Sequence, residues 1–478
     1  MRESILSVGI DIGTSTTQLV FSRIVIENLA GAASVPRVQI VDKQIVYRSD
    51  IYFTPLVSSE TIDGERVRDI VASEYARAGI KPEDLSAGAV IITGETARKE
   101  NARLVLEKLS GFAGDFVVAT AGSDLEGIIA GRGAGSAAIS KEKNNVIVNF
   151  DVGGGTTNAA IFSNGDVIDT SCLDVGGRLV KLNPESRHVE YITPKVKELI
   201  NSMNLDIKEG RIASLESLRV LTRRMAAFVD ELTGLAPESG MIDLFLTSKR
   251  FKTHRPLDGV TFSGGVADAV YAPEDATRLF RYGDIGIVLG SAIRETELFR
   301  RVKVYKPAET IRATVVGAGI HIVNVSGSTI TYTRDDLFPL KNLPVLKLSD
   351  EDEGESYSNL AAGVAEKLKW FREGEAYQHV ALSFKGVRSP SFDLVSFIAS
   401  QIADGVKDAL LGWKHVVVIV EEDMAKALGH ALASRLAGVD VVSIDSVNVE
   451  NGDYIDIGRP LGQGRVVPVV IKTLVFGG

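Results

Sequence analysis

One line of sequence occurs twice in this chain, first as GIDIGTSTTQLVF at residues 9–21 and again as FDVGGGTTNAAIF at residues 150–162. In each copy a β-rich stretch is followed by a turn of small and hydroxyl residues and then by a second β-rich stretch. The matched residues are Val8 and Val148, Asp11 and Asp151, Gly13 and Gly153, Thr16 and Thr156, and Thr17 and Thr157. Repetition of this kind indicates duplicated structural units. We expect two related lobes that face each other across a cleft.

The second copy places three adjacent glycines in what would otherwise be a plain turn between buried strands. Glycine gives the unfolded chain extra freedom and costs stability, so an ordinary hairpin does not need all three. Backbone N–H groups in such a turn can point at one spot and hold a phosphate. An Asp- and Gly-containing hairpin is the alternative for either copy alone, and the duplication favours the phosphate turn.

The composition narrows the class of protein. The 478 residues are enough for about three compact units, and 45% hydrophobic with 24% charged residues is typical of a globular protein. The net charge of −9 argues against nucleic acid as the main partner. The single cysteine, Cys172, excludes a disulfide framework and fits a reducing compartment. No apolar run is long enough to predict secretion or membrane insertion.

The order of expected elements indicates an α/β fold. Strands are expected at 88–93 and 115–120, and helices at 96–111 and 124–140. A long helical stretch is expected over about 194–234, and a second α/β rhythm begins with VTFSGGVADAV at residues 260–270.

A separate α/β unit is expected at the carboxy-terminal end. SDEDEGESYSN (349–359) is acidic and serine-rich, which is typical of a surface loop or linker. Beyond it, the pattern predicts a βαβαβ series with a parallel sheet. Its members are the strands 379–384, 415–420 and 440–445, a helix ending near Leu411 and a helix over 423–437.

The repeated aspartates suggest where chemistry occurs. Two opposed carboxylates suit a hydrated magnesium ion, which keeps several waters and takes one or two protein carboxylates. The hydroxyls of Thr14, Ser15, Thr16, Thr17, Thr156 and Thr157 add neutral donors. A third turn, with Ser263, Gly264 and Gly265, could let an adenine ring lie on the backbone. VVGAGIHI (315–322) is a weaker alternative for that role, and no P-loop or H-E-x-x-H motif is present.

These motifs resemble, in their order, the superfamily of actin, sugar-kinase and Hsp70-chaperone ATPases. GIDIGTSTTQLVF and FDVGGGTTNAAIF look like its two phosphate motifs, and FSGGVADAV looks like its adenosine motif. DLEGIIAG and GDIGIVLGSAI are similar to the two helices that connect the subdomains, and LDVGGRLVKL (173–182) resembles the double-glycine turn of chaperone-like members. The resemblance implies duplicated actin-like (ribonuclease H-like) ATPase lobes followed by a carboxy-terminal α/β domain. The expected divisions are 1–145, 146–328 and 329–478.

The superfamily pattern also implies roles for individual residues. Asp11 and Asp151 would hold Mg²⁺ through water, and Glu126 would orient the attacking water, with Asp124 as a competitor for that role. The residues implied to surround the ATP molecule are Gly13, Thr14, Ser15, Thr16, Thr17, Gly153, Gly154, Gly155, Thr156, Thr157, Ser263, Gly264 and Gly265. Gly154 is expected to need positive φ as well as space for the phosphate.

Three further segments narrow the resemblance to the family of reactivating factors of ethanolamine ammonia-lyase. They are GAVIITGETARKENA, TAGSDLEGIIAG and YIDIGRPLGQGRVVPVVIKTLVFG, and the likeness covers nearly the whole chain. It implies an ATP-dependent chaperone-like protein that restores an adenosylcobalamin enzyme by promoting exchange of damaged cobalamin. The implied partner is the lyase, without nucleic acid or membrane, and self-association is left open. The implied location is cytoplasmic, with association with a bacterial microcompartment.

Two other functions share the same phosphate turns. A small-molecule kinase of the sugar-kinase type would need a catalytic base and a polar acceptor pocket, neither of which the sequence places. An actin-like filament or scaffold ATPase would need a repeating heterologous interface.

Overall fold

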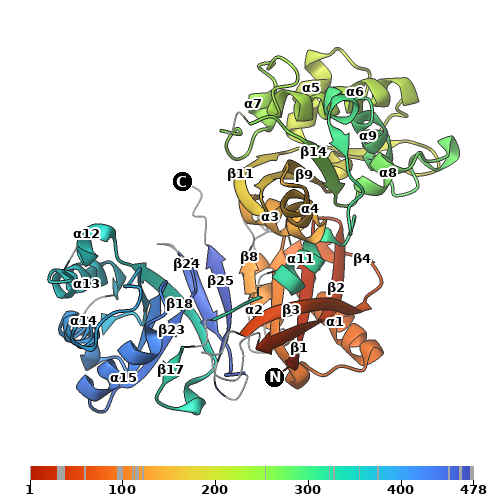
Figure 1. Ribbon diagram of the computed structural model, residues 1–478. Coiled ribbons are helices and arrows are strands. Elements are labelled where there is room, and N and C mark those ends of the chain that lie inside the picture. The colour runs from red at the N-terminus through yellow and green to blue at the C-terminus, as the bar shows by residue number, and fades with distance from the viewer. Residues whose placement is uncertain are drawn as a thin grey trace.

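The computed structural model describes residues 2–28, 38–58, 61–93, 101–109, 112, 118–120, 123–252, 255–321, 323–326, 329–354, 356–373, 376–449, 453–461, 464 and 466–473. Three sheets organise these residues (Figure 1). The first part of the helix expected at 96–111 and of the strand expected at 115–120 lies outside the described residues.

The first sheet is built around the strand that carries Asp11. Its main order is β3-β2-β1-β7-β8, antiparallel between the first three strands and parallel between the last three. Its strands are β1 (Arg2–Ile12), β2 (Thr16–Asn28), β3 (Val38–Arg48), β7 (Leu85–Ile92), β8 (Val118–Thr120) and the short β4 (Tyr52–Phe53), which pairs with β2. Helices α1 (Gly64–Ala78) and α2 (Ala102–Leu109) share a buried apolar cluster with these strands. β5 (Leu56–Ser58) and β6 (Thr61–Ile62) form a small hairpin nearby in the sequence.

The second sheet repeats this arrangement. Its order is β11-β10-β9-β14-β15, with the same antiparallel and parallel pairs as in the first sheet. Its strands are β9 (Val146–Val152), β10 (Thr157–Ser163), β11 (Asp166–Leu173), β14 (Gly259–Ser263) and β15 (Lys303–Val304). Asp11 and Asp151 therefore occupy equivalent places near the ends of β1 and β9, which confirms the duplication seen in the sequence.

The helical part of the second lobe differs from the sequence expectation in two places. The helix expected over 124–140 is two helices, α3 (Ser123–Gly133) and α4 (Ser136–Lys143), which are separated at Gly135 with its positive φ. The single stretch expected over 194–234 is two helices, α5 (Pro194–Ser202) and α6 (Leu215–Leu232). Asn204 and Gly210, both with positive φ, interrupt the stretch between them. The remaining elements of this lobe are β12 (Val180–Leu182), β13 (Val189–Ile192), α7 (Ile242–Phe245), α8 (Ala267–Tyr271), α9 (Gly286–Ile293) and α10 (Glu297–Arg301).

Two helices join the lobes, and only one of them is the expected one. Helix α3 (Ser123–Gly133), which contains DLEGIIAG, packs on the second sheet, and α11 (Ala313–His321) packs on the first sheet and on α3 (Figure 1). GDIGIVLGSAI was expected to be the second connecting helix, and this is wrong, because α9 packs against α6 and α8 inside the second lobe. The segment weighed as an alternative adenosine turn, 315–322, instead supplies most of the second joining helix.

The joint between α3 and α11 depends on very close backbone contact. A Cβ on Gly133 would lie 1.9 Å from the carbonyl oxygen of Ala313, and one on Gly317 would lie 2.1 Å from that of Ile129. Neither distance is tolerable for a real side chain, so the absence of side chains at Gly133 and Gly317 lets the helices meet.

The third sheet confirms the expected βαβαβ series and extends it. β21 (Ala381–Phe384), α14 (Phe392–Gly405), β22 (His415–Val420), α15 (Ala425–Arg435) and β23 (Asp440–Asp445) form the series, with parallel pairing throughout. The sheet continues on both sides, in the order β16-β25-β24-β18-β21-β22-β23-β17. The added strands are β16 (Val323–Val325), β17 (Thr331–Tyr332), β18 (Leu340–Lys347), β24 (Asp453–Ile457) and β25 (Pro468–Thr473). A short hairpin, β19 (Arg372–Glu373) and β20 (Ala376–Tyr377), precedes β21.

The acidic segment 349–359 is not simply a loop. Helix α12 (Asp350–Glu353) begins at Ser349, whose hydroxyl and backbone pair reciprocally with Asp352 in a capping box. Glu353 is buried and accepts hydrogen bonds from the backbone N–H groups of Lys385 and Gly386. The segment leads into α13 (Leu360–Leu368) and belongs to the third unit.

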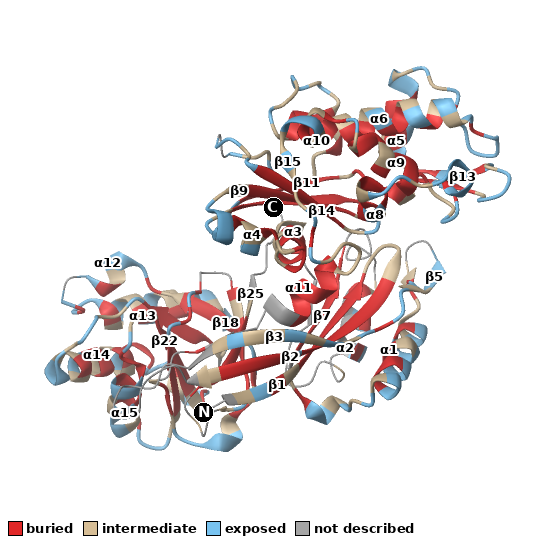
Figure 2. Cartoon of the chain, turned by 45° about the vertical axis from the view of Figure 1, so that its right-hand side comes forward, coloured by how far each residue is buried: buried red, intermediate tan, exposed pale blue. Residues whose placement is uncertain are grey.

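Each unit has its own apolar core (Figure 2). One cluster fills the second lobe, another lies between the first sheet and α1 and α2, and two more cover the faces of the third sheet. Strand β16 places residues 323–325 in the third sheet, so the division at 328/329, like that at 145/146, remains a prediction. Within the described ranges, no helix combines the length and apolar character needed to cross a membrane.

Candidate functional site

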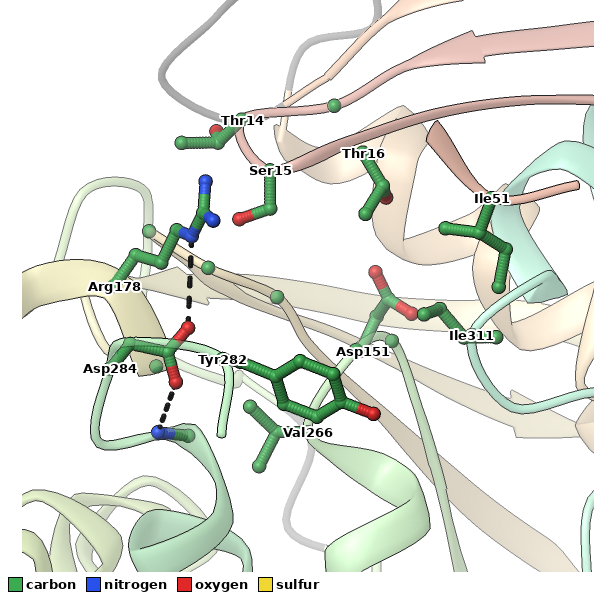
Figure 3. A pocket seen from close by; sticks show the side chains of 18 of the residues that line it. Thr14, Ser15, Thr16, Ile51, Asp151, Arg178, Val266, Tyr282, Asp284 and Ile311 are labelled. Carbon is green, nitrogen blue, oxygen red and sulfur yellow. Dashed lines mark hydrogen bonds and ion pairs between the residues drawn. The ribbon is translucent and has the colours of Figure 1, made fainter. Parts of the chain in front are cut away.

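A pocket of about 380 Å³ lies where the two lobes face each other. Both repeated turns line it, together with residues of β4, α3, the turn after β14 and the segment before α9 (Figure 3). It therefore combines residues that are more than 250 positions apart in the chain, such as Asp11 and Asp284.

Asp11 lies near the end of β1 with its carboxylate at the bottom of this pocket. It is buried, and Thr93 donates a hydrogen bond of 2.9 Å to its Oδ1. In the sheet, Asp11 is opposite Gln18 on β2. Gln18 donates from Nε2 to the carbonyl oxygen of Ile311, which brings the segment before α11 to the pocket.

Asp151 has an equivalent environment on β9. It is buried opposite Asn158 on β10, and Ser263 of the neighbouring parallel strand donates to its Oδ1 at 2.6 Å. Thr314 at the start of α11 donates to its Oδ2 at 3.5 Å. Each lobe thus holds its aspartate with a hydroxyl from the parallel side of the sheet and places a carboxamide on the antiparallel side.

Both carboxyl groups are held in a state that disfavours negative charge. Burial raises the pKa of Asp11 to about 7. The hydrogen bond from Thr93 lowers this pKa, and the negative charge of Asp151 raises it further. Burial also raises the pKa of Asp151 to about 6, partly offset by the hydroxyls of Ser263 and Thr314. A cation between the two carboxylates would relieve both effects.

This donor set fits a hydrated magnesium ion. Among the described residues, no three His, Cys, Asp or Glu side chains gather as a metal-binding group, and two carboxylates with room for water are what Mg²⁺ takes from a protein. The hydroxyls of Thr14 and Ser15 are buried at the pocket and have no hydrogen-bond partner in the structure. Such atoms need a ligand or water to satisfy them.

The two glycine turns touch each other across the cleft. A Cβ on Gly154 would lie 2.2 Å from the Ser15 hydroxyl oxygen, so glycine is required there by close approach. The expectation of positive φ at Gly154 is wrong, because its φ is outside that region. The double-glycine turn supports it from behind, since the N–H groups of Gly177 and Arg178 donate to the carbonyl oxygens of Gly153 and Gly154.

Most of the predicted nucleotide residues line the pocket, and three lie behind its wall. Those at the wall are Gly13, Thr14, Ser15, Thr16, Gly153, Gly154, Gly155, Thr156, Gly264 and Gly265. Thr17 and Thr157 are buried, with hydroxyls that bond Thr54 and the carbonyl oxygen of Val175. Ser263 is buried and reaches the site only through Asp151. Alternation along a strand turns these three side chains into the fold.

The turn after β14 provides a different wall. Gly264 has φ of +88° and fits tightly against the backbone of Val152, whereas a Cβ on Gly265 would meet nothing within 4 Å. Val266 and Tyr282 lie beside this open face (Figure 3). A flat ring can therefore approach the backbone at Gly265, and an adenine ring at this turn remains a prediction.

Of the two acidic candidates on α3, Glu126 is the one that lines the pocket. It is buried near the start of the helix. Asp124 does not line the pocket, and its Oδ1 is buried without a hydrogen-bond partner.

Sequence reasoning did not assign many of the residues that line the pocket, and the polar ones nearest the aspartates and glycine turns include Gln18, Thr93, Arg178, Asp284 and Thr314. Gln18 carried a usable sequence pattern, because Gln18 and Asn158 are matched carboxamides of the duplicated line, and Arg178 lies within the double-glycine segment LDVGGRLVKL. The others reach the pocket from segments whose placement depends on the packing of the lobes.

The repeated strand order and the interlobe pocket define a two-lobed protein of the actin-like, ribonuclease H-like class, with an α/β domain added at its carboxy-terminal end. Within that class, the chain belongs to the family described as ethanolamine utilisation protein EutA, whose model matches residues 3–477.

Two relatives extend the match to almost the full length. Both are named "Ethanolamine ammonia-lyase reactivase EutA", one from Salmonella typhimurium strain LT2 and one from Escherichia coli strain K12. Each is 36% identical to this chain, over 481 and 482 residues respectively, and each alignment covers 99% of this chain and 98% of the relative. Among solved structures, this chain is similar to the Ppx/GppA family member of Aquifex aeolicus. The alignment covers 66% of this chain and 97% of the Aquifex chain, with 14% sequence identity and a TM-score of 0.39.

Proposed function

We propose that this protein is an ATP-dependent reactivase that restores inactivated adenosylcobalamin-dependent ethanolamine ammonia-lyase by promoting release and exchange of damaged cobalamin. The observation that carries the proposal is the full-length relationship to two proteins named as reactivases of that lyase. The interlobe pocket, with paired aspartates between facing glycine turns, supports ATP as the ligand.

The residues of the pocket divide into three roles in this proposal. Asp11 and Asp151 would hold Mg²⁺, which would supply positive charge to offset that of the phosphates. The glycine turns and the hydroxyls of Thr14 and Ser15 receive the phosphate oxygens. Glu126 orients the water that attacks the terminal phosphate.

The joint between the lobes offers a path from the pocket to the client. Ile311 and Thr314 line the pocket at the segment that leads into α11, and α11 packs on α3. ATP and ADP would contact the two lobes differently and so shift the population of open and closed states. The lyase would respond to that shift.

The third domain is proposed to recognise the client. None of its described residues lines the pocket. Some of the most exposed large apolar side chains lie on it: Leu411, Phe392 and Trp370. Exposed apolar groups are typical of surfaces that bind another protein. The proposed setting is the cytoplasm, in association with a bacterial microcompartment.

The test is rescue of the lyase after its cobalamin has been damaged. Purified protein with ATP and Mg²⁺ should restore lyase activity and release the damaged cobalamin, and omission of either ATP or Mg²⁺ should prevent both. Lyase that stays inactive with the complete mixture would contradict the proposal. Phosphate transfer to a small acceptor would point to a kinase, and nucleotide-dependent sedimentation would point to a filament.

A further inference from the structure

Acidic side chains outnumber basic ones in the lining of the pocket as a whole. Six acidic side chains line the pocket: Asp11, Glu126, Asp151, Asp268, Glu274 and Asp284. Of the described residues that line it, the cations are Arg178 and Arg281. A polyphosphate needs positive charge beyond one divalent ion to enter such a site, because like charges repel strongly where water is limited.

Arg281 is already engaged by two other residues that line the pocket. It pairs with Glu274 at 2.7 Å, with a second contact at 3.4 Å, and its guanidinium lies 4.6 Å from the centre of the Tyr282 ring. Its charge is therefore largely balanced.

Arg178 lies where the two repeated turns meet. Its backbone N–H donates to the carbonyl oxygen of Gly154, and a Cβ on Gly154 would lie 3.6 Å from the Arg178 Cβ and 2.2 Å from the Ser15 hydroxyl oxygen. The guanidinium points toward the turn that carries Thr14 and Ser15 (Figure 3). Those two hydroxyls are the buried ones that have no hydrogen-bond partner.

Arg178 is held from both lobes, but loosely. Its Nε lies 3.7 Å from Oδ2 of Asp284, which is beyond hydrogen-bond distance, and the other oxygen of Asp284 accepts from the backbone N–H of Gly286. On the other side, the ring of Phe53 from the first lobe lies 5.2 Å from the guanidinium. This arrangement keeps the planar guanidinium group of Arg178 near the two glycine turns. Its N–H donors are left available to a phosphate.

We propose that Arg178 is the phosphate-binding cation of this site, and that it distinguishes ATP from nucleotides with fewer phosphates. Asp284 acts as its positioning residue, and Phe53 ties its position to the first lobe. This assignment rests on the proposed function, because it takes ATP as the ligand of the pocket.

The experiment measures the affinities of the full-length protein for ATP, ADP and AMP by calorimetry with Mg²⁺ present. Arg178→Gln should weaken ATP binding on the order of tenfold or more, ADP less and AMP little, because each lost contact is to a phosphate. Arg178→Lys keeps the positive charge but loses the planar guanidinium group. Its ATP affinity should lie between those of Arg178→Gln and the wild type. The AMP affinity measured on the same sample shows whether the pocket has kept its shape.

Arg281→Gln is the matched control, since it removes one positive charge from the same pocket. In Arg281→Gln, any loss of affinity should be similar for ATP, ADP and AMP. If Arg178→Gln and Arg281→Gln weaken ATP binding equally, the assignment of Arg178 is wrong. The same holds if Arg178→Gln binds ATP as tightly as the wild type does. Neither result contradicts the proposed function. Wild-type protein that binds none of the three nucleotides would contradict the proposed function and the assignment together.

Discussion

At the scale of single residues, the site depends on charged groups whose burial is unfavourable until a ligand arrives. Asp11 and Asp151 are buried, with hydroxyl donors in place of cations. Glycine at position 154 leaves just enough room for Ser15 of the opposite lobe. Each of these features gives a substitution with a definite expected result.

Asp151→Ala should reduce ATP hydrolysis about a hundredfold or more, because charge stabilisation by a metal is commonly worth several kcal/mol. The rate is measured as phosphate release at saturating ATP and Mg²⁺. Asp151→Asn is the companion variant, since it can still accept the hydrogen bond from Ser263 and should lose activity without loss of stability. Wild-type turnover in either variant would refute the magnesium assignment.

Gly154→Val should lower ATP affinity about ten- to hundredfold, because overpacking of one to three kcal/mol falls directly on the contact with Ser15. Calorimetry checks the prediction. The control variant is Gly240→Val, because a side chain at Gly240 would meet no atom within 4 Å, and this variant should bind ATP normally. Gly165 is not suitable as a control, because its positive φ would strain a valine. Normal affinity in Gly154→Val would show that the turn is only a hairpin.

A pair of histidines should make the third domain sensitive to acid. His379 stacks on both Trp413 and His415, and burial lowers the pKa of His379 and of His415. Because the folded protein favours the neutral rings, unfolding takes up protons, and stability is lost as the pH falls below about 6.5. His415→Phe should show a smaller loss in urea unfolding between pH 7.5 and pH 6 than the wild type.

His430→Gln changes an exposed histidine of the same domain and should keep the full pH effect. If His415→Phe and the wild type lose the same stability, the histidine stack does not carry the effect.

At the scale of elements, the joint between α3 and α11 is the most constrained contact. Small residues on both helices allow backbone to meet backbone, and α11 also crosses the first sheet near Gly9. A helix crossing of this kind fixes how the two lobes are related. It also explains why the segment 315–322 is so rich in glycine and alanine, which in the sequence looked like a turn.

Gly317→Ala should destabilise the protein by about 1–3 kcal/mol, although alanine is the better helix former. The added methyl would lie 2.1 Å from the carbonyl oxygen of Ile129 and force the helices apart. Chemical denaturation measures the change, with Gly240→Ala, at an open and exposed position, as the neutral control. Equal or greater stability in Gly317→Ala would mean that the joint yields easily.

At the scale of the whole molecule, the nucleotide pocket and the third domain are separate in both core and sequence. Described residues that line the pocket lie between Asp11 and Thr314, and the third sheet begins at β16. Strand β18 pairs with both β21 and β24, which joins early and late strands of the third domain in one sheet.

A fragment of residues 1–321 should bind ATP with wild-type affinity and fail to restore the lyase, because it keeps the pocket and the joint but lacks the proposed client-binding domain. The measurements are calorimetry and the rescue assay on the same preparation. Full rescue by a soluble fragment would exclude client recognition by the third domain. An insoluble fragment would instead indicate that this domain covers apolar surface of the lobes.

The sequence alone determined the duplicated lines, the α/β class, the parallel series in the third domain, and the paired aspartates and glycine turns at the pocket wall. These follow from local patterns, since a strand, a glycine turn and a hydroxyl run are each written in adjacent residues. Only the tertiary structure decided that α11 is the second joining helix, that Thr17, Thr157 and Ser263 face inward, and that Gly154 lies against both Ser15 and Arg178. Those facts depend on the packing of segments that are far apart in the chain. A sequence pattern within one segment does not predict which distant segment it will contact.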